Sequence, residues 1–249
     1  MKRITFEVEG KKLVGFLHRP ENKNNSGVVM IHGFKGDKNE YGRFEKSAEV
    51  FCKDGFTVLR FDCRGTRDSD GEFRDMTIQS EVKDLVAAID VMKKENVENV
   101  GIMGISLGGE IALLSSLQRD VKALVLWAPV TTSEKWKTTF SEEQMNDLKT
   151  KGETIIYGKK SGEPWTIGKE LLDSFMNTKV EDELSKIKAA TLILHGTKDV
   201  NVSLEDSKKA IEKLNEPKEL KIIEGEDHYF LEQLDDMIEI SLNWFRKYL

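Results

Sequence analysis

The stretch Gly104-Ile105-Ser106-Leu107-Gly108 decides how the rest of the chain is interpreted. It is a G-x-S-x-G pentapeptide that follows the apolar run 100–103 and precedes the helix-forming residues 109–114. A buried strand that turns sharply into a helix lifts the serine hydroxyl above the sheet. The helix N-terminus then offers free backbone N–H groups and partial positive charge to a developing oxyanion. Because an ordinary glycine-rich turn also fits the pattern, other parts of the chain must distinguish the two.

Composition limits the classes of protein to which the chain can belong. It has 249 residues, of which 39% are hydrophobic and 33% charged, and its formal net charge is −6. This length suffices for one large domain with a full core. An acidic chain without a strongly basic face or tail gives no reason to expect nucleic acid as a partner. The two cysteines, Cys52 and Cys63, do not make a disulfide framework, and we expect both to be buried thiols.

The sequence shows neither the pattern of a signal peptide nor that of a membrane-spanning helix. The residues after the basic start Met1-Lys2-Arg3 alternate in polarity and do not form the apolar core of a signal peptide. No apolar run approaches the roughly 18 residues of a membrane-spanning helix, so we expect no membrane partner. The sequence therefore predicts a cytoplasmic protein and leaves its oligomeric state open, including a homo-oligomer.

Strand and helix patterns alternate along most of the chain. Apolar runs predict eight strands, at 4–8, 12–18, 27–32, 56–62, 100–103, 123–128, 191–195 and 219–223. Helical spacing of apolar residues predicts helices at 41–54, 82–92, 109–117, 204–214 and 231–245. This alternation predicts an α/β fold whose mostly parallel sheet has helices on both faces. Functional loops are then expected at the carboxyl ends of the strands.

Residues 130–188 interrupt the alternation. They are mostly polar, with scattered aromatic residues, and they stand between the sixth and seventh predicted strands. We interpret 1–249 as a single domain and 130–188 as an insertion within it. The insertion's aromatic residues are either a substrate wall or a small core of its own, and Trp136 and Trp165 are the candidates for contact with a substrate. Lys159 and Lys160 are interpreted as part of a solvated face.

A serine nucleophile needs a base within hydrogen-bonding reach, and histidine suits this role near neutral pH. His228 follows the last predicted strand and is expected on the same sheet edge as Ser106. His195 lies in a buried strand and is interpreted as a packed residue, whereas His18 is expected at the surface. The fourth histidine, His32, is expected to brace a loop.

The histidine in turn needs an acid that orients it and stabilises the imidazolium. Asp199 is the best candidate because it directly follows the predicted strand 191–195. Asp62 lies on the far side of Ser106, and Asp227 adjoins His228 too closely for a direct side-chain bond. The order along the chain is then Ser106, Asp199, His228, which is the order of one fold family.

Two backbone N–H groups are needed to hold an oxyanion. One is that of Leu107, directly after the serine, and the other is expected from Phe34 in the loop that begins His32-Gly33-Phe34. Gly33 allows the backbone to bend toward the site. The loss of one such donor typically costs about 10²–10³ in turnover.

These motifs together resemble the α/β-hydrolase superfamily of serine hydrolases, and within it small bacterial esterases of the feruloyl (cinnamoyl) type and their peptidase-like cousins. The resemblance extends over nearly the whole chain outside the insertion. It rests on five segments, His32-Gly33-Phe34, Asp62 to Gly71, Gly104 to Gly109, Gly196 to Asp199, and Asp227-His228. The resemblance implies that 130–188 is a cap that shapes the acyl or alcohol pocket. The chain departs from the group at Thr66-Arg67, where Gly-x is usual, which affects only the shape of that loop.

We therefore hypothesise a carboxylic-ester hydrolase with a Ser106-His228-Asp199 triad, an oxyanion hole at Phe34 and Leu107, and a small-molecule ester as substrate. No cofactor is required, and no metal-ligand spacing or phosphate-binding loop is present. Amide or thioester hydrolysis by the same triad remains open. An acidic anchor such as Glu163 or Glu170 would favour a peptidase. A non-catalytic module that binds a small molecule is the alternative from another class.

Overall fold

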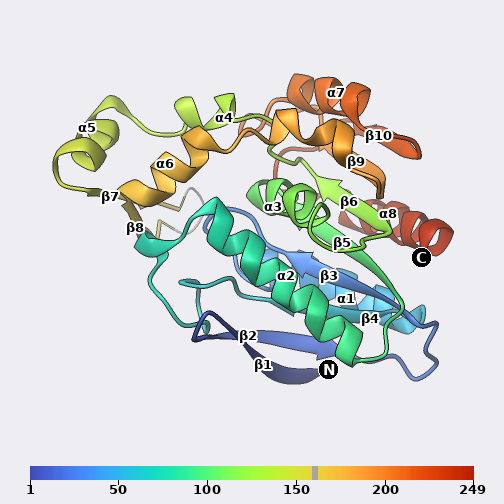
Figure 1. Cartoon of the computed structure of the whole chain (residues 1–249). Helices are drawn as coiled ribbons and strands as arrows, with labels where there is room; N and C mark the ends of the chain where they lie inside the picture. Colours follow the sequence, from blue (N-terminus) through green and yellow to red (C-terminus); the bar gives the residue numbers. More distant parts are fainter. Residues whose placement is uncertain (159–161) are drawn as a thin grey trace.

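Eight strands form one sheet in the order β1-β2-β4-β3-β5-β6-β9-β10 in the computed structural model, which describes residues 1–158 and 162–249 (Figure 1). The strands are β1 (Lys2–Val8), β2 (Lys11–His18), β3 (Ser26–Ile31), β4 (Thr57–Phe61), β5 (Asn99–Ile105), β6 (Ala123–Trp127), β9 (Ala190–Gly196) and β10 (Lys218–Ile223). β2 runs antiparallel to both of its neighbours, and all other neighbouring pairs are parallel. The predicted α/β fold with a mostly parallel eight-stranded sheet is confirmed.

Helices cover both faces of the sheet, as predicted. One face packs against α1 (Arg43–Lys53) and α8 (Leu234–Tyr248), and the other against α2 (Ile78–Lys94) and α3 (Leu107–Ser115). The central strand β3 shows why: Val28 and Met30 belong to the first core, whereas Val29 and Ile31 belong to the second. Since successive side chains of a strand point to opposite faces, a continuous apolar run is buried on both. The helix α7 (Leu204–Lys213) packs against β9 and β10.

Two predicted helix starts move toward the C-terminus. The residues Glu40–Gly42 form a short 3₁₀ turn, η1, and Gly42 is left-handed with φ 86°, so α1 begins at Arg43 rather than at Tyr41. A left-handed residue cannot continue a right-handed helix. The last helix begins at Leu234 rather than at Leu231, and Leu231 lies exposed outside it.

The chain between β6 and β9 forms a group of short elements. These are α4 (Glu134–Lys137), α5 (Glu142–Thr150), β7 (Glu153–Tyr157), β8 (Pro164–Gly168), α6 (Lys169–Asn177), η3 (Val180–Asp182) and η4 (Leu184–Lys186). β7 and β8 pair as an antiparallel hairpin, which the sequence analysis did not predict. The group lies above α2 and α3 in Figure 1, and β8 packs against the 3₁₀ turn η2 (Phe73–Asp75). Lys159 and Lys160 lie outside the described residues.

Two predictions about burial are wrong. His18 is not at the surface: it is 4% exposed, and its Nε2 accepts a hydrogen bond of 3.1 Å from Nε of Arg60. The reason is topological, because β2 lies between β1 and β4 rather than at the sheet edge. Cys63 is buried as expected, whereas Cys52 on α1 is only half-buried. Within the described part of the chain, no helix combines the length and the apolar content that crossing a bilayer requires.

The burial of His18 predicts a pH effect on stability. Burial lowers its pKa from 6.5 to about 4, and the charge of Arg60 acts in the same direction. The unfolded chain therefore binds more protons between these values, so folding is weakened as pH falls from 6.5 toward 4. We expect the thermal midpoint to fall across this window in the wild type and to fall less in His18→Gln, whose amide oxygen still accepts from Arg60. Equal slopes for the two proteins would contradict this.

Candidate active site

Ser106 occupies a strained turn between β5 and α3. Its backbone has φ 55° and ψ −119°, an unfavourable conformation for a residue with a side chain, and α3 begins at the next residue. Hydrogen bonds hold it there: its N–H donates to the carbonyl of Trp127, and its carbonyl accepts from Gly109 and Val130, each at 3.0 Å. The surrounding structure therefore enforces a conformation that presents the serine side chain at the carboxyl end of the sheet.

The glycines of the pentapeptide are required by close backbone contacts. A Cβ on Gly104 would lie 2.5 Å from the carbonyl oxygen of Gly108. A Cβ on Gly108 would lie 2.4 Å from the carbonyl oxygen of Ile31, at the end of β3. Both distances are far below van der Waals contact, so β3, β5 and α3 approach this closely only because these two side chains are absent.

Asp199 and His228 meet at the same end of the sheet. Asp199 follows β9 and His228 follows β10, and Nδ1 of His228 lies 2.6 Å from Oδ2 of Asp199. The other carboxylate oxygen accepts from the backbone N–H groups of Asn201 and Val202, at 2.7 and 2.9 Å. The carboxylate is completely buried, while the imidazole is 14% exposed.

The surroundings of Asp199 keep it ionised. Burial alone would raise its pKa, but hydrogen bonds from His195 and His228 outweigh burial and hold the pKa well below the usual range. An ionised carboxylate has only acceptor atoms, so Nδ1 of His228 carries the hydrogen of this pair. In the neutral imidazole this tautomer leaves the lone pair on Nε2, which is the arrangement that a general base needs.

His195 is packed in the interior, as predicted, but it also touches the acid. Its side chain is fully buried, with Nδ1 2.8 Å from Oγ of Ser207. Nε2 lies 3.1 Å from the carbonyl oxygen of Val202 and 3.4 Å from Oδ2 of Asp199. The sequence did not reveal this second contact to Asp199, although the spacing of four residues across a tight turn permits it.

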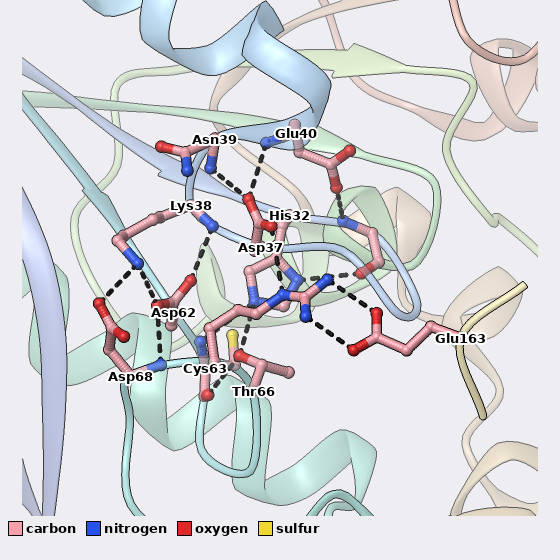
Figure 2. Close-up of polar contacts among 12 residues, drawn as sticks. His32, Asp37, Lys38, Asn39, Glu40, Asp62, Cys63, Thr66, Asp68 and Glu163 are labelled. Carbon is pink, nitrogen blue, oxygen red and sulfur yellow. Dashed lines mark hydrogen bonds and ion pairs between the residues drawn. The ribbon is translucent and has the colours of Figure 1, made fainter. Parts of the chain in front are cut away.

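The loop after β3 lies against the serine. A Cβ on Gly33 would be 3.3 Å from Cβ of Ser106 and 3.2 Å from the carbonyl oxygen of Ile105. His32 braces this loop as expected, with Nδ1 2.9 Å from the carbonyl oxygen of Gly33 and Nε2 3.1 Å from the amide nitrogen of Cys63 (Figure 2). Across residues 1–158 and 162–249, no acceptor is recorded for the backbone N–H of Phe34 or Leu107. Both groups therefore have the free donors that their predicted role requires.

A cavity of about 900 Å³ connects these residues. Ser106, Asp199 and His228 all line it, and residues 134–158 between β6 and β9 contribute to its wall. Trp136 lines the cavity and stacks on Phe175, with ring centroids 3.8 Å apart. Trp165, the second aromatic candidate, does not line it: its ring packs against Phe73 at 4.5 Å and belongs to a buried core. Trp136 is thus part of the cavity wall, whereas Trp165 is part of a buried core.

The sequence of residues 43–249 matches the prolyl oligopeptidase family. The chain belongs to the prolyl oligopeptidase family. With its sheet order and its serine turn, it has the α/β-hydrolase fold.

Two curated relatives of this family member are, by name, a thiohydrolase and a palmitoyl-protein thioesterase. Thiohydrolase aneE of Aspergillus aculeatus is 30% identical over 146 residues, which are 57% of this chain and 43% of the relative. The mitochondrial palmitoyl-protein thioesterase ABHD10 of Rattus norvegicus is 28% identical over 167 residues, 61% of this chain and 54% of the relative. The chain thus spans about half the length of these relatives.

Among solved structures, Est1E from Butyrivibrio proteoclasticus with bound ferulic acid is similar over 98% of both chains. Its TM-score is 0.85 at 25% sequence identity. An α/β hydrolase, GrgF from Penicillium, matches with a TM-score of 0.81 at 20% identity, over 99% of this chain and 98% of that one, and shows the fold alone.

Glu110, on the first turn of α3, was missed by the sequence analysis. It is fully buried, and its Oε2 accepts a hydrogen bond of 3.3 Å from Nε1 of Trp136. Among the described residues, its Oε1 has no hydrogen-bond partner. Burial raises the pKa of Glu110 well above its ordinary value, because the interior disfavours the charged form of the carboxyl group. In this prolyl oligopeptidase family member, Glu110 thereby holds a wall residue of the cavity.

Among the described residues, no three histidine, cysteine, aspartate or glutamate side chains come together in the way that a metal centre would need. The two acidic residues considered as a peptidase anchor, Glu163 and Glu170, do not line the cavity, although Glu134 of the same segment does. Glu163 is engaged by Arg67, with two hydrogen bonds of 2.8 and 2.9 Å (Figure 2), and Glu170 is exposed on α6.

The close approach at Gly108 predicts a loss of stability on substitution. In Gly108→Ala, the new Cβ would meet the carbonyl oxygens of Ile31 and His32 at 2.4 and 2.5 Å. Such overpacking costs about 1–3 kcal/mol when the neighbours are backbone atoms that cannot turn aside. We expect urea denaturation to show a reduction of that size in the free energy of unfolding. A wild-type unfolding free energy in the variant would contradict it.

Proposed function

We propose that this chain is a serine hydrolase that cleaves carboxylic esters through an acyl-enzyme on Ser106. The observation that carries the proposal is the 2.6 Å contact between His228 and an ionised Asp199, in the cavity that Ser106 also lines. A serine becomes a nucleophile only when a base takes its proton, and such a base needs an acid that fixes its orientation. The coarser description, an α/β-hydrolase-type hydrolase, follows from the family and the fold.

In the proposed reaction, Oγ of Ser106 attacks the ester carbonyl while Nε2 of His228 accepts its proton. The bond to the alcohol then breaks, and His228 returns the proton to the leaving oxygen. Water, activated by the same imidazole, attacks the acyl-enzyme and releases the acid. Asp199 stabilises the imidazolium that forms twice along this path. Every proton is carried by the chain's own residues, so no cofactor is needed.

The backbone N–H groups of Phe34 and Leu107 are proposed to hold the oxyanion. Leu107 is the first residue of α3, so its N–H also lies at the positive end of the helix dipole. The close packing of Gly33 on Ser106 supports a placement of the neighbouring Phe34 N–H near the attacked carbonyl. Donors arranged before the reaction stabilise the transition state because they need no reorientation.

For the substrate, we propose a small-molecule ester whose acyl or alcohol part contacts the segment 130–188, which acts as a cap within one domain of residues 1–249. Trp136 and Phe34 form an aromatic part of the cavity wall, with ring centroids 5.9 Å apart. An aromatic acyl group such as a hydroxycinnamate would stack there, in line with the ferulic acid bound to Est1E. Thioesters are the second candidate, favoured by the two curated relatives.

Peptidase activity is the remaining catalytic alternative, suggested by the family description. Because Arg67 engages the carboxylate of Glu163 and Glu170 is exposed outside the cavity wall, neither supplies an anchor for a substrate amine. A panel of hydroxycinnamate esters, short-chain aryl esters, thioesters and aminoacyl amides ranks these candidates directly by kcat/KM. A fluorophosphonate probe separates all of them from a non-catalytic binding module, which would not react.

Replacement of the nucleophile is the first test. Ser106→Ala should lower kcat on an aryl ester by roughly 10⁵–10⁶-fold, because the acyl-enzyme cannot form. Labelling by the fluorophosphonate should disappear, while the thermal midpoint stays close to that of the wild type. A kcat equal to that of the wild type would contradict the proposal.

The acid is tested by a matched pair of variants. Asp199→Asn keeps the size of the side chain but cannot stabilise the imidazolium, so kcat should fall by roughly 10⁴-fold. Asp227→Asn alters the carboxylate next to His228. Within the described part of the chain, Oδ1 of Asp227 accepts a hydrogen bond of 2.7 Å from the backbone N–H of Tyr229. The Asp227 variant should therefore keep most of its kcat. The reverse ranking would transfer the acid role to Asp227.

A further inference from the structure

A buried ion pair links the two loops that flank the proposed reaction centre. Oε2 of Glu40 accepts a hydrogen bond of 2.6 Å from Nη2 of Arg43, and the two side chains are only 4% and 3% exposed. Oε1 of Glu40 accepts from the backbone N–H of Gly33 at 2.6 Å, in the loop after β3 (Figure 2). Nη1 of Arg43 donates to the carbonyl oxygen of Tyr229 at 2.7 Å. One connected set of hydrogen bonds thus runs from Gly33 to Tyr229.

The backbone of the turn that carries Glu40 is strained. Glu40 has φ 45° and Tyr41 has φ 57°, two consecutive residues with side chains in the left-handed region. Each such residue costs about 1–3 kcal/mol, and such strain persists only where the surroundings enforce it. Here Nε of Arg43 donates to the carbonyl oxygen of Glu40 at 2.9 Å, which closes the turn.

The loop after β3 is wrapped around the Glu40 carboxylate. A Cβ on Gly36 would lie 2.3 Å from Oε1 of Glu40, and the N–H of Gly36 donates to the carbonyl oxygen of Gly33 at 2.9 Å. The carboxylate is therefore enclosed by the same turn that presents Phe34. A shift of Glu40 cannot occur without a shift of this loop.

The partners of the pair are adjacent in sequence to the proposed catalytic groups. Gly33 precedes Phe34, the proposed oxyanion donor, and Tyr229 follows His228, the proposed base. We propose that Glu40 and Arg43 are positioning residues that fix the oxyanion loop relative to the loop of His228. This inference rests on the proposed function and adds two residues to it that touch neither the nucleophile nor the base.

Arg43 also has an electrostatic effect, because it neutralises the charge of Glu40. Glu40 and Arg43 both line the cavity that contains Ser106. A carboxylate left unpaired there would oppose the negative charge that develops on the substrate oxygen in the transition state. Arg43 neutralises it locally. A buried ion pair adds little net stability compared with apolar residues of similar volume, so its position across the site is the feature that needs an explanation.

The test is a double-variant cycle with Glu40→Gln, Arg43→Met and both together, assayed on an aryl ester with active enzyme counted by fluorophosphonate. Glu40→Gln retains an acceptor for the N–H of Gly33, so we expect its kcat to fall by roughly 10-fold. We expect the kcat of Arg43→Met to fall by roughly 10²-fold, because this variant leaves the carboxylate of Glu40 without its cationic partner. KM should change little. The double variant should be no slower than Arg43→Met alone, since the two side chains act as one unit.

Controls separate positioning from stability. Trp244→Phe removes a buried hydrogen bond of 3.1 Å to the carbonyl of Ala190, at the amino end of β9 and thus away from the site. It should lower the thermal midpoint and leave kcat unchanged. The proposal is overturned if the Glu40 and Arg43 variants lose only thermal stability, if their effect is in KM, or if the losses in kcat multiply in the double variant. Since Ser106→Ala tests the nucleophile independently, such a result would contradict the positioning role and not the hydrolase.

Discussion

The close packing of three backbone segments around Ser106 is the constraint on which the rest of the site depends. The end of β3, the end of β5 and the first turn of α3 come so near to one another that a Cβ on Gly104 or Gly108 would meet carbonyl oxygens at about 2.5 Å. The serine sits within this packing in its strained conformation, with φ 55° and ψ −119°. It also places the loop of Gly33 directly against the serine side chain. The nucleophile and the oxyanion loop are thus positioned by one packing contact.

Charge in this region is buried only where it is compensated. Asp199 receives hydrogen bonds from two backbone N–H groups and from His228, and its pKa stays low despite its burial. Glu40 is paired with Arg43, and Lys38 lies 2.6 Å from Asp62 on the far side of the same loop (Figure 2). Glu110, whose hydrogen-bond partner is the neutral side chain of Trp136, has its pKa raised by burial instead. Each of these carboxyl groups is therefore either paired or has a pKa that burial has raised, because the low dielectric of the interior disfavours an unpaired charge.

The fold could be predicted from local patterns wherever one physical effect dominates. Continuous apolar runs at 27–32 and 123–128 predicted strands buried on both faces, and apolar spacing predicted the helices. The β7–β8 hairpin was not predicted because, unlike the equally short β6, β7 is not a continuous apolar run: Thr154 is buried whereas Ile155 and Tyr157 are exposed. His18 was misjudged because its burial depends on β2 being an inner strand, and the order of strands in a sheet is a long-range property. Trp165 could not be distinguished from Trp136 by composition alone.

The sequence by itself determined the residue types and the chain order of the candidate site. A serine between two glycines, an aspartate after one strand and a histidine after the next already predict that Ser106, Asp199 and His228 share one sheet edge, because parallel strands bring their carboxyl ends together. Only the tertiary structure decided which other groups join them. The contacts from Arg43 to Tyr229 and from His195 to Asp199 depend on side-chain directions in tightly packed loops. No local pattern encodes those directions, since they are set by packing between segments far apart in the chain.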